Sequence, residues 1–110
     1  METPIKTRAS RRAELDSTLR TILGSSNIYY QPPENTKITT YPAIVYTRTT
    51  IDPQYADNLM YLNKTCYEIT LIDRRPDSPL IDLLMDLPSC RYLRHVSVSG
   101  VNNDTFRIYY

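Results

Sequence analysis

The sequence is poor in the residues from which many catalytic and cofactor-binding motifs are built. Its 110 residues include 2 glycines and 1 histidine. The two glycines, Gly24 and Gly100, are too few for a G-x-G-x-x-G loop and too far apart for a P-loop, and a single imidazole has no second one with which to share a metal ion. No apolar run approaches the roughly 20 residues of a membrane helix, and the N-terminus lacks a signal-peptide core. We therefore expect no membrane partner and a protein that is intracellular where it is made.

Net charge and length exclude further classes of protein. The 13 Lys and Arg residues against 12 Asp and Glu residues give a formal charge of +1, which is far from the balance of a dedicated nucleic-acid binder. A chain of this length fits one domain. Its two cysteines, Cys66 and Cys90, have no metal or redox spacing. We expect both to be reduced thiols in the core or on strands.

Among the residues that are present, the aromatic ones are unevenly distributed. The chain has 10 tyrosines, 1 phenylalanine and no tryptophan. Most of its large rings therefore carry a hydroxyl that needs water or a partner. Tyrosine is enriched at protein–protein contacts, which favours a subunit of an assembly. The alternative is that tyrosine takes the place of phenylalanine on half-buried strands.

Two amphipathic helices are predicted. Met1 to Ser10 is polar and basic, so we interpret residues 1–10 as a flexible arm. A helix over 11–23 follows from the spacing of its apolar residues, and Gly24 suits its C-terminal end. A second, short helix follows Ser78, a plausible N-cap, and Pro79. The expected buried residues are Leu15, Leu19, Ile22 and Leu23 in the first helix, and Leu80, Leu83, Leu84 and Leu87 in the second.

The remaining regular segments have the composition and alternation of strands. They are Asn27–Tyr30, Tyr41–Arg48, Thr65–Asp73, Arg91–Ser99 and Thr105–Tyr110. Residues 100–104 contain Gly, Asn and Asp and are predicted to form the last turn. The order of elements predicts an α+β fold with a mostly antiparallel mixed sheet of four to five strands and two helices packed on one face. Residues 11–110 form this single domain.

The segment from Asp52 to Lys64 is too apolar for a loop that only connects two strands. We predict an extended hairpin or arm at about residues 50–65. Its apolar residues mark an interaction site, such as a contact with a neighbouring subunit. The alternative is that Leu59 and Leu62 fold back onto their own core. The predicted interface residues are Tyr55, Asp57, Asn58, Leu59, Met60, Tyr61 and Leu62.

No constellation of residues predicts catalysis. Cys90 and His95 are five residues apart across a helix-to-strand junction, which is a poor signal for a dyad. The carboxylates Asp73, Asp77, Asp82 and Asp86 could approach a hard cation, but a turn at Asp77 and a solvent-facing helix for Asp82 and Asp86 are the favoured explanation. We predict no catalytic residue, no cofactor and no metal.

Basic side chains gather in a few places and could meet phosphate groups, although solvated faces and subunit salt bridges are the commoner explanation. The candidate electrostatic contacts are Arg11, Arg12, Arg74 and Arg75.

Several motifs, taken in order, resemble one family of short phage proteins. They are Tyr41-Pro42-Ala43-Ile44-Val45-Tyr46, Tyr55-Ala56-Asp57-Asn58, the run from Tyr67 to Pro79, and Phe106-Arg107-Ile108-Tyr109-Tyr110. This series is similar to the tail-terminator, or tail-completion, group of long non-contractile-tailed bacteriophages. The similarity spans roughly Arg11 to Tyr110. The motifs are structural, so the resemblance rests on their order and spacing.

The resemblance implies a mixed sheet flanked by helices and a virion protein that forms a ring, commonly of six subunits. The ring caps the tail tube at its head-proximal end, stops tube polymerisation and provides the head–tail joining surface. Its partners would be copies of itself, the tail-tube protein and a head–tail connector or neck protein. DNA would pass through the ring only as cargo, and the subunit would be made in the host bacterial cytoplasm.

Two alternatives remain open at the level of sequence. The first is a neck, head-completion or minor tail protein of the same particle, which tail-tube association would distinguish. The second is a small nucleic-acid-binding domain that uses the basic N-terminal arm, for which salt-dependent DNA affinity would be diagnostic.

Overall fold

The computed structural model describes residues 8–34, 36–49 and 65–110 and contains two helices and a five-stranded sheet. The predicted α+β class is confirmed. Most of the predicted arm lies outside the described residues, together with its interface residues Tyr55, Asp57, Asn58, Leu59, Met60, Tyr61 and Leu62. The elements in chain order are α1 (Arg8–Leu23), β1 (Ile28–Tyr30), β2 (Ala43–Thr49), β3 (Cys66–Asp73), α3 (Pro79–Met85), β4 (Cys90–Val98) and β5 (Val101–Tyr109).

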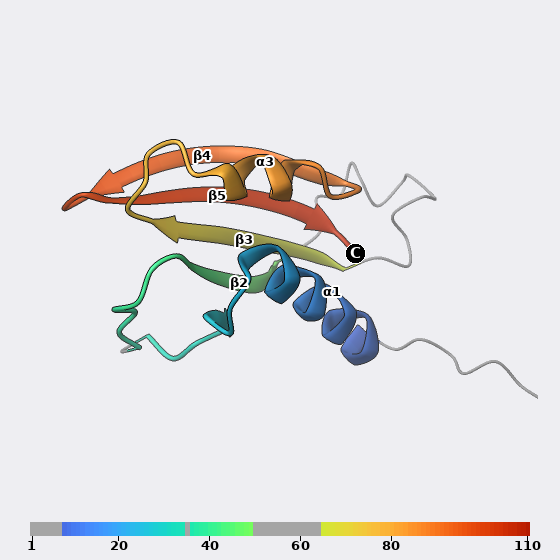
Figure 1. Ribbon diagram of the computed structural model, residues 1–110. Helices are drawn as coiled ribbons and strands as arrows, with labels where there is room; N and C mark the ends of the chain where they lie inside the picture. Colours follow the sequence, from blue (N-terminus) through green and yellow to red (C-terminus); the bar gives the residue numbers. More distant parts are fainter. Residues whose placement is uncertain (1–7, 35, 50–64) are drawn as a thin grey trace, which may run out of the picture.

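The strands lie in the order β1-β2-β3-β5-β4. β1 pairs in parallel with β2, and the other neighbours are antiparallel. Both helices cover the same face of this sheet (Figure 1). Alternate strand residues on that face point into the core, as the period of two requires. The largest core side chains are Leu15, Leu19, Ile44, Tyr46, Tyr67, Ile69, Leu71, Leu84, Phe106 and Ile108.

Helix α1 begins at Arg8, three residues before the predicted start, so the predicted arm of residues 1–10 is too long at its C-terminal end. The added residues include arginine and alanine, which are strong helix formers, and no proline or glycine interrupts them. The helix ends as expected at Leu23, and Gly24 follows with a left-handed φ of 75°. Neither α1 nor α3 has the length and apolarity needed to cross a membrane.

Helix α3 confirms the predicted start but corrects the predicted buried face. The Ser78 Oγ accepts a hydrogen bond from the Leu80 amide at 3.3 Å, and Pro79 is the first helical residue. Leu80 and Leu84 are buried, whereas Leu83 is 47% exposed, so its predicted burial is wrong. Leu83 lies at the margin of the apolar stripe and faces a groove shared with Ile22 of α1.

The β4–β5 hairpin corrects the predicted final turn. Val98 pairs with Val101, so the turn consists of Ser99 and Gly100. Both have left-handed backbones, with φ values of 53° and 77°, as in a two-residue type I′ hairpin turn. Residues 101–104 therefore belong to β5, and the prediction that they form a turn is wrong. The consequence is that Asp104 becomes a strand residue on the core side of the sheet.

Candidate functional site

A β-bulge in β4 brings three polar side chains to the core-facing side of the hairpin. Tyr92 pairs with Phe106 and Arg94 pairs with Thr105, so Leu93 is an extra residue on β4. In a regular strand, residues three apart point to opposite faces. The inserted residue instead directs Tyr92 and His95 to the same face, where Asp104 lies opposite His95.

These three side chains form a hydrogen-bonded cluster, which we call the Asp104 cluster. The Tyr92 hydroxyl donates to Asp104 Oδ1 at 2.6 Å. The His95 Nδ1 lies 2.8 Å from the same oxygen. Because an ionised carboxylate only accepts hydrogen bonds, we assign the imidazole proton to Nδ1. Burial, assisted by the bond to Asp104, raises the pKa of Tyr92 to about 12, so its hydroxyl stays a donor at neutral pH.

The two oxygens of the Asp104 carboxylate differ in their hydrogen bonding. Asp104 is only 1% exposed, and its Oδ2 is buried with no hydrogen-bond partner among the described residues. Such atoms are rare in native proteins, since a buried acceptor without a donor costs about 1–3 kcal/mol. Asp104 also lines an open cavity of about 530 Å³ between α3 and the hairpin. The cluster thus combines a charged buried group with unused acceptor capacity and a space beside it.

A second carboxylate–tyrosine pair lies on the same side of the sheet, between α1 and β2. The Tyr46 hydroxyl donates to Asp16 Oδ2 at 2.6 Å, and Arg20 donates to Asp16 Oδ1. Arg12 contacts the Tyr46 hydroxyl at 3.5 Å and lies 4.4 Å over the Tyr30 ring. Burial raises the pKa of Tyr46. Burial alone would raise the pKa of Asp16, but its hydrogen bonds from Tyr46 and Arg20 hold it below the usual value.

The basic residues predicted as electrostatic contacts make contacts within the chain. Arg12 belongs to the Asp16 pair just described. Arg75 forms a salt bridge with buried Asp73 at 2.9 Å, and Arg74 lies 5.3 Å from the Tyr41 ring centre. Burial would raise the pKa of Asp73, but hydrogen bonds from Arg75 and Ser78 lower it below the usual value. A partner that binds these arginines must therefore compete with, or add to, existing contacts.

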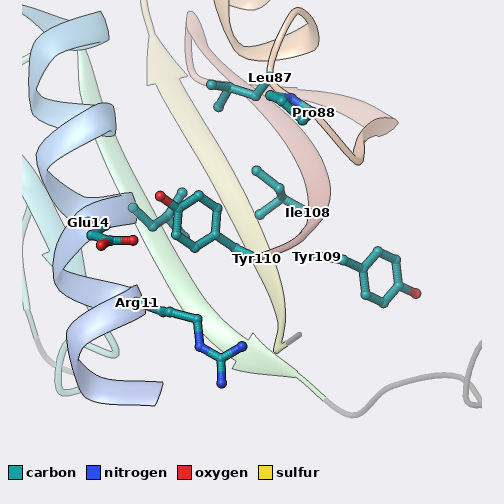
Figure 2. A pocket seen from close by; sticks show the side chains of 8 residues that line it. Arg11, Glu14, Leu87, Pro88, Ile108, Tyr109 and Tyr110 are labelled. Atoms are coloured by element: carbon teal, nitrogen blue, oxygen red, sulfur yellow. The ribbon is translucent and has the colours of Figure 1, made fainter. Parts of the chain in front are cut away.

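Arg11 lies beside a smaller groove where α1 meets the C-terminal end of the chain. Figure 2 shows Arg11 and Glu14 on the helix, with the Tyr110 ring extending from the end of β5 toward them. The groove has a volume of about 250 Å³, and Leu15, Leu87 and Ile108 supply apolar walls. A partner that reaches Arg11 from this side also meets Tyr110.

The two cysteines are free thiols on neighbouring parts of the sheet, as expected. Burial raises the pKa of Cys66, and it raises that of Cys90 to about 11. Neither thiol is therefore activated as a thiolate at neutral pH. Cys90 is paired with Ile108 and His95 with Asp104, so the register does not bring this sequence-local pair together.

Metal ligation finds no support in residues 8–34, 36–49 and 65–110, where no three His, Cys, Asp or Glu side chains are placed to hold an ion. Asp73 is engaged by Arg75, and Asp77 lines the cavity beside Asp104.

Comparison with known protein families, with characterised proteins and with solved structures finds no match to this chain.

The sequence patterns place His95 correctly on a strand but do not predict the Asp104 cluster. They place Asp104 in a turn, and the bulge at Leu93 has no clear signature in the sequence. The available signal was the Ser99-Gly100 pair, because a Ser-Gly dipeptide between two β-rich segments marks a turn. A turn at that point would have placed Asp104 opposite His95.

Proposed function

We propose that this chain is a structural subunit of a long-tailed bacteriophage particle, a tail-terminator protein that forms a homo-oligomeric ring on the tail tube. The order of motifs from Tyr41 to Tyr110 supports this proposal, as does the mixed sheet with helices on one face. Ring closure requires each subunit to present two different patches that fit each other. The surface of the described residues offers one such patch.

The observation that carries the proposal is the outer strand of the sheet. β4 has nine residues and, in the described part of the chain, pairs with another strand on one side only. Val96 and Val98 lie on the sheet face away from the helices and are 47% and 59% exposed. A long outer strand with exposed β-branched residues is a template for pairing with another chain. Figure 1 shows this hairpin at the outer edge of the sheet, with its turn beyond the end of β3.

Charges on the same face limit how this patch pairs. Arg94 forms a salt bridge with Glu68 at 3.1 Å across the intervening strand β5. Charged residues on outer strands discourage unspecific edge-to-edge association. A partner surface that matches both the valines and this ion pair is therefore selected over a merely apolar one. Such selectivity is what a ring with a fixed number of subunits needs.

The proposal is tested with the purified full-length chain by light scattering and negative-stain micrographs, alone and with tail tubes. We expect rings that bind one end of the tube and stop its growth. The double variant Val96→Asp/Val98→Asp should lose the rings while its melting temperature changes by only a few degrees. Ser97→Asp is the matched control, because Ser97 is exposed on the same strand but on the opposite face.

Three outcomes would contradict the proposal or part of it. A chain that stays monomeric at all concentrations and ignores tail tubes would contradict the ring. Rings that bind only neck components would favour the neck or head-completion alternative. Salt-dependent DNA binding at micromolar concentration without ring formation would favour the nucleic-acid-binding alternative.

A further inference from the structure

The Asp104 cavity has the chemistry of a site for an organic cation. The Asp104 carboxylate uses Oδ1 for two donors, and its buried Oδ2 has none among the described residues. A charged oxygen in this state gains more from a charged donor than from a neutral one. The missing partner is therefore best supplied by a positively charged N–H group.

The walls of the cavity fit the remainder of such a ligand. Pro76, Ile81 and Met85 provide an apolar surface, and Asp77 adds a second carboxylate. No lysine or arginine appears among the described residues that line the cavity. Long cationic side chains typically lay their methylene groups along apolar surface and direct the charged head to a polar group.

Other ligands fit less well. An anion would face the two carboxylates, Asp104 and Asp77. A metal ion lacks a third protein ligand among the described residues. Nucleophilic chemistry lacks an activated group, because the Tyr92 hydroxyl is committed to Asp104 and its pKa is raised.

We propose that this cavity binds an ammonium or guanidinium group on a short apolar stem, such as a lysine or arginine side chain of another polypeptide. The charged head lies against the Asp104 carboxylate and supplies Oδ2 with a donor once the side chains that cover this oxygen move aside, and the stem lies along Ile81 and Met85. Asp77 lies at the solvent side and attracts the cation as it approaches. This binding does not depend on the ring proposed above, so each can fail without the other.

The test is a titration of the full-length chain with butylguanidinium chloride, followed by NMR signals of the His95 ring and the Ile81 and Met85 methyl groups. We expect saturable shifts with a dissociation constant in the millimolar range, as for a single small side chain. Butylurea, a neutral molecule of similar shape, should give no saturation. Sodium chloride at equal ionic strength should not reproduce the shifts.

Variants decide whether the carboxylates are responsible. Asp104→Asn should weaken binding by about tenfold or more, since a hydrogen bond to a buried charge is lost. Asp77→Asn should weaken it by roughly two- to fivefold, since Asp77 is exposed. Asp82→Asn is the matched control, because Asp82 is an exposed α3 carboxylate that is absent from the described cavity lining, and it should change nothing.

The absence of saturable shifts would overturn the proposal, as would equal affinity in folded Asp104→Asn. If Asp104→Asn does not fold, unchanged affinity in Asp77→Asn overturns it and weakened affinity supports it. Titration with 1,4-diaminobutane identifies the source of the cation. Affinity more than tenfold above that of butylammonium indicates a free diamine, whereas equal affinity indicates a side chain.

Discussion

Two carboxylates on the same side of the sheet differ in what surrounds them. Asp16 and Asp104 each accept a hydrogen bond from a tyrosine hydroxyl at 2.6 Å. Arg20 occupies the other oxygen of Asp16, whereas the other oxygen of Asp104 has no partner among the described residues. The first pair lies between α1 and β2, and the second lies beside an open cavity.

The difference separates a stabilising contact from a candidate binding site. Both oxygens of Asp16 accept a hydrogen bond, and Arg12 and Arg20 offset its charge, so this network ties α1 to β2. Around Asp104 the charge is held by a tyrosine and a histidine, and one oxygen is left unused. Polar groups that are buried but incompletely bonded lower stability, and proteins keep them where another property requires it.

The largest effect should come from the core on which both clusters rest. Leu84→Ala should lower the free energy of unfolding by about 2–5 kcal/mol, because Leu84 is fully buried. Leu83→Ala should cost about 1 kcal/mol or less, because its side chain is half exposed. Urea denaturation of both variants measures the difference. Equal losses of stability would mean that α3, which forms one wall of the cavity, does not bury Leu84 more deeply than Leu83.

The next effect distinguishes the two tyrosines directly. Tyr46→Phe leaves Asp16 Oδ2 without its hydroxyl donor and should cost about 1–3 kcal/mol. Tyr92→Phe should cost about 1 kcal/mol less, because His95 still contacts the same Asp104 oxygen. Thermal and urea denaturation at neutral pH measure both. A larger loss in Tyr92→Phe would show that the Asp104 cluster, too, is chiefly a stabilising contact.

The core beneath these clusters could be predicted from the sequence, because it depends on periodicity. Leu15 and Leu19 recur at helical spacing, and Tyr67, Ile69 and Leu71 alternate along one strand. Burial of one face favours a single register in such segments. The class of fold and the positions of both helices followed from these patterns, within a few residues at each end.

The clusters could not be predicted in the same way, because neither depends on periodicity alone. Asp16 meets Tyr46 only after α1 packs on β2, and the alignment of Tyr92 with His95 needs the extra residue Leu93. Ser99 has an uncommon left-handed backbone for a residue other than glycine, and Asn102-Asn103-Asp104 has the composition of a turn. Composition therefore pointed to the wrong turn.

A smaller effect concerns alkaline pH. The pKa of Tyr92 is raised to about 12 in the folded chain, chiefly by burial. An unfolded tyrosine ionises near pH 10, so between about pH 10 and 12 the folded state holds a proton that the unfolded state has lost. Stability should therefore fall as pH rises through this window. Tyr92→Phe should show a shallower fall in urea denaturation at stepped pH, and an identical slope would contradict the raised pKa.

The smallest effect concerns Arg20, the hydrogen-bond donor to the second oxygen of Asp16. Removing it tests whether this donor is what makes Asp16 differ from Asp104. Arg20→Gln removes the charged donor from Asp16 Oδ1 and should cost about 0.3–0.5 kcal/mol, as is usual for an exposed pair one helical turn apart. The pKa of Asp16 is held below its usual value partly by Arg20, so it should rise in the variant. A carboxyl group with a lowered pKa adds stability above about pH 4 and loses it as pH falls further. The variant should therefore lose less stability on acidification than the wild-type chain, which carboxyl NMR titration and acid denaturation can measure.

Arg20→Gln also leaves Asp16 with an oxygen that lacks a charged partner, as in Asp104. Asp16 does not line the 530 Å³ cavity, however, so this variant should bind butylguanidinium no better than the wild-type chain. A new binding event at Asp16 would show that an unsatisfied carboxylate oxygen is sufficient by itself. The lack of one would show that the apolar walls beside Asp104 are also required, because a small cation at a partly exposed carboxylate gains little over water.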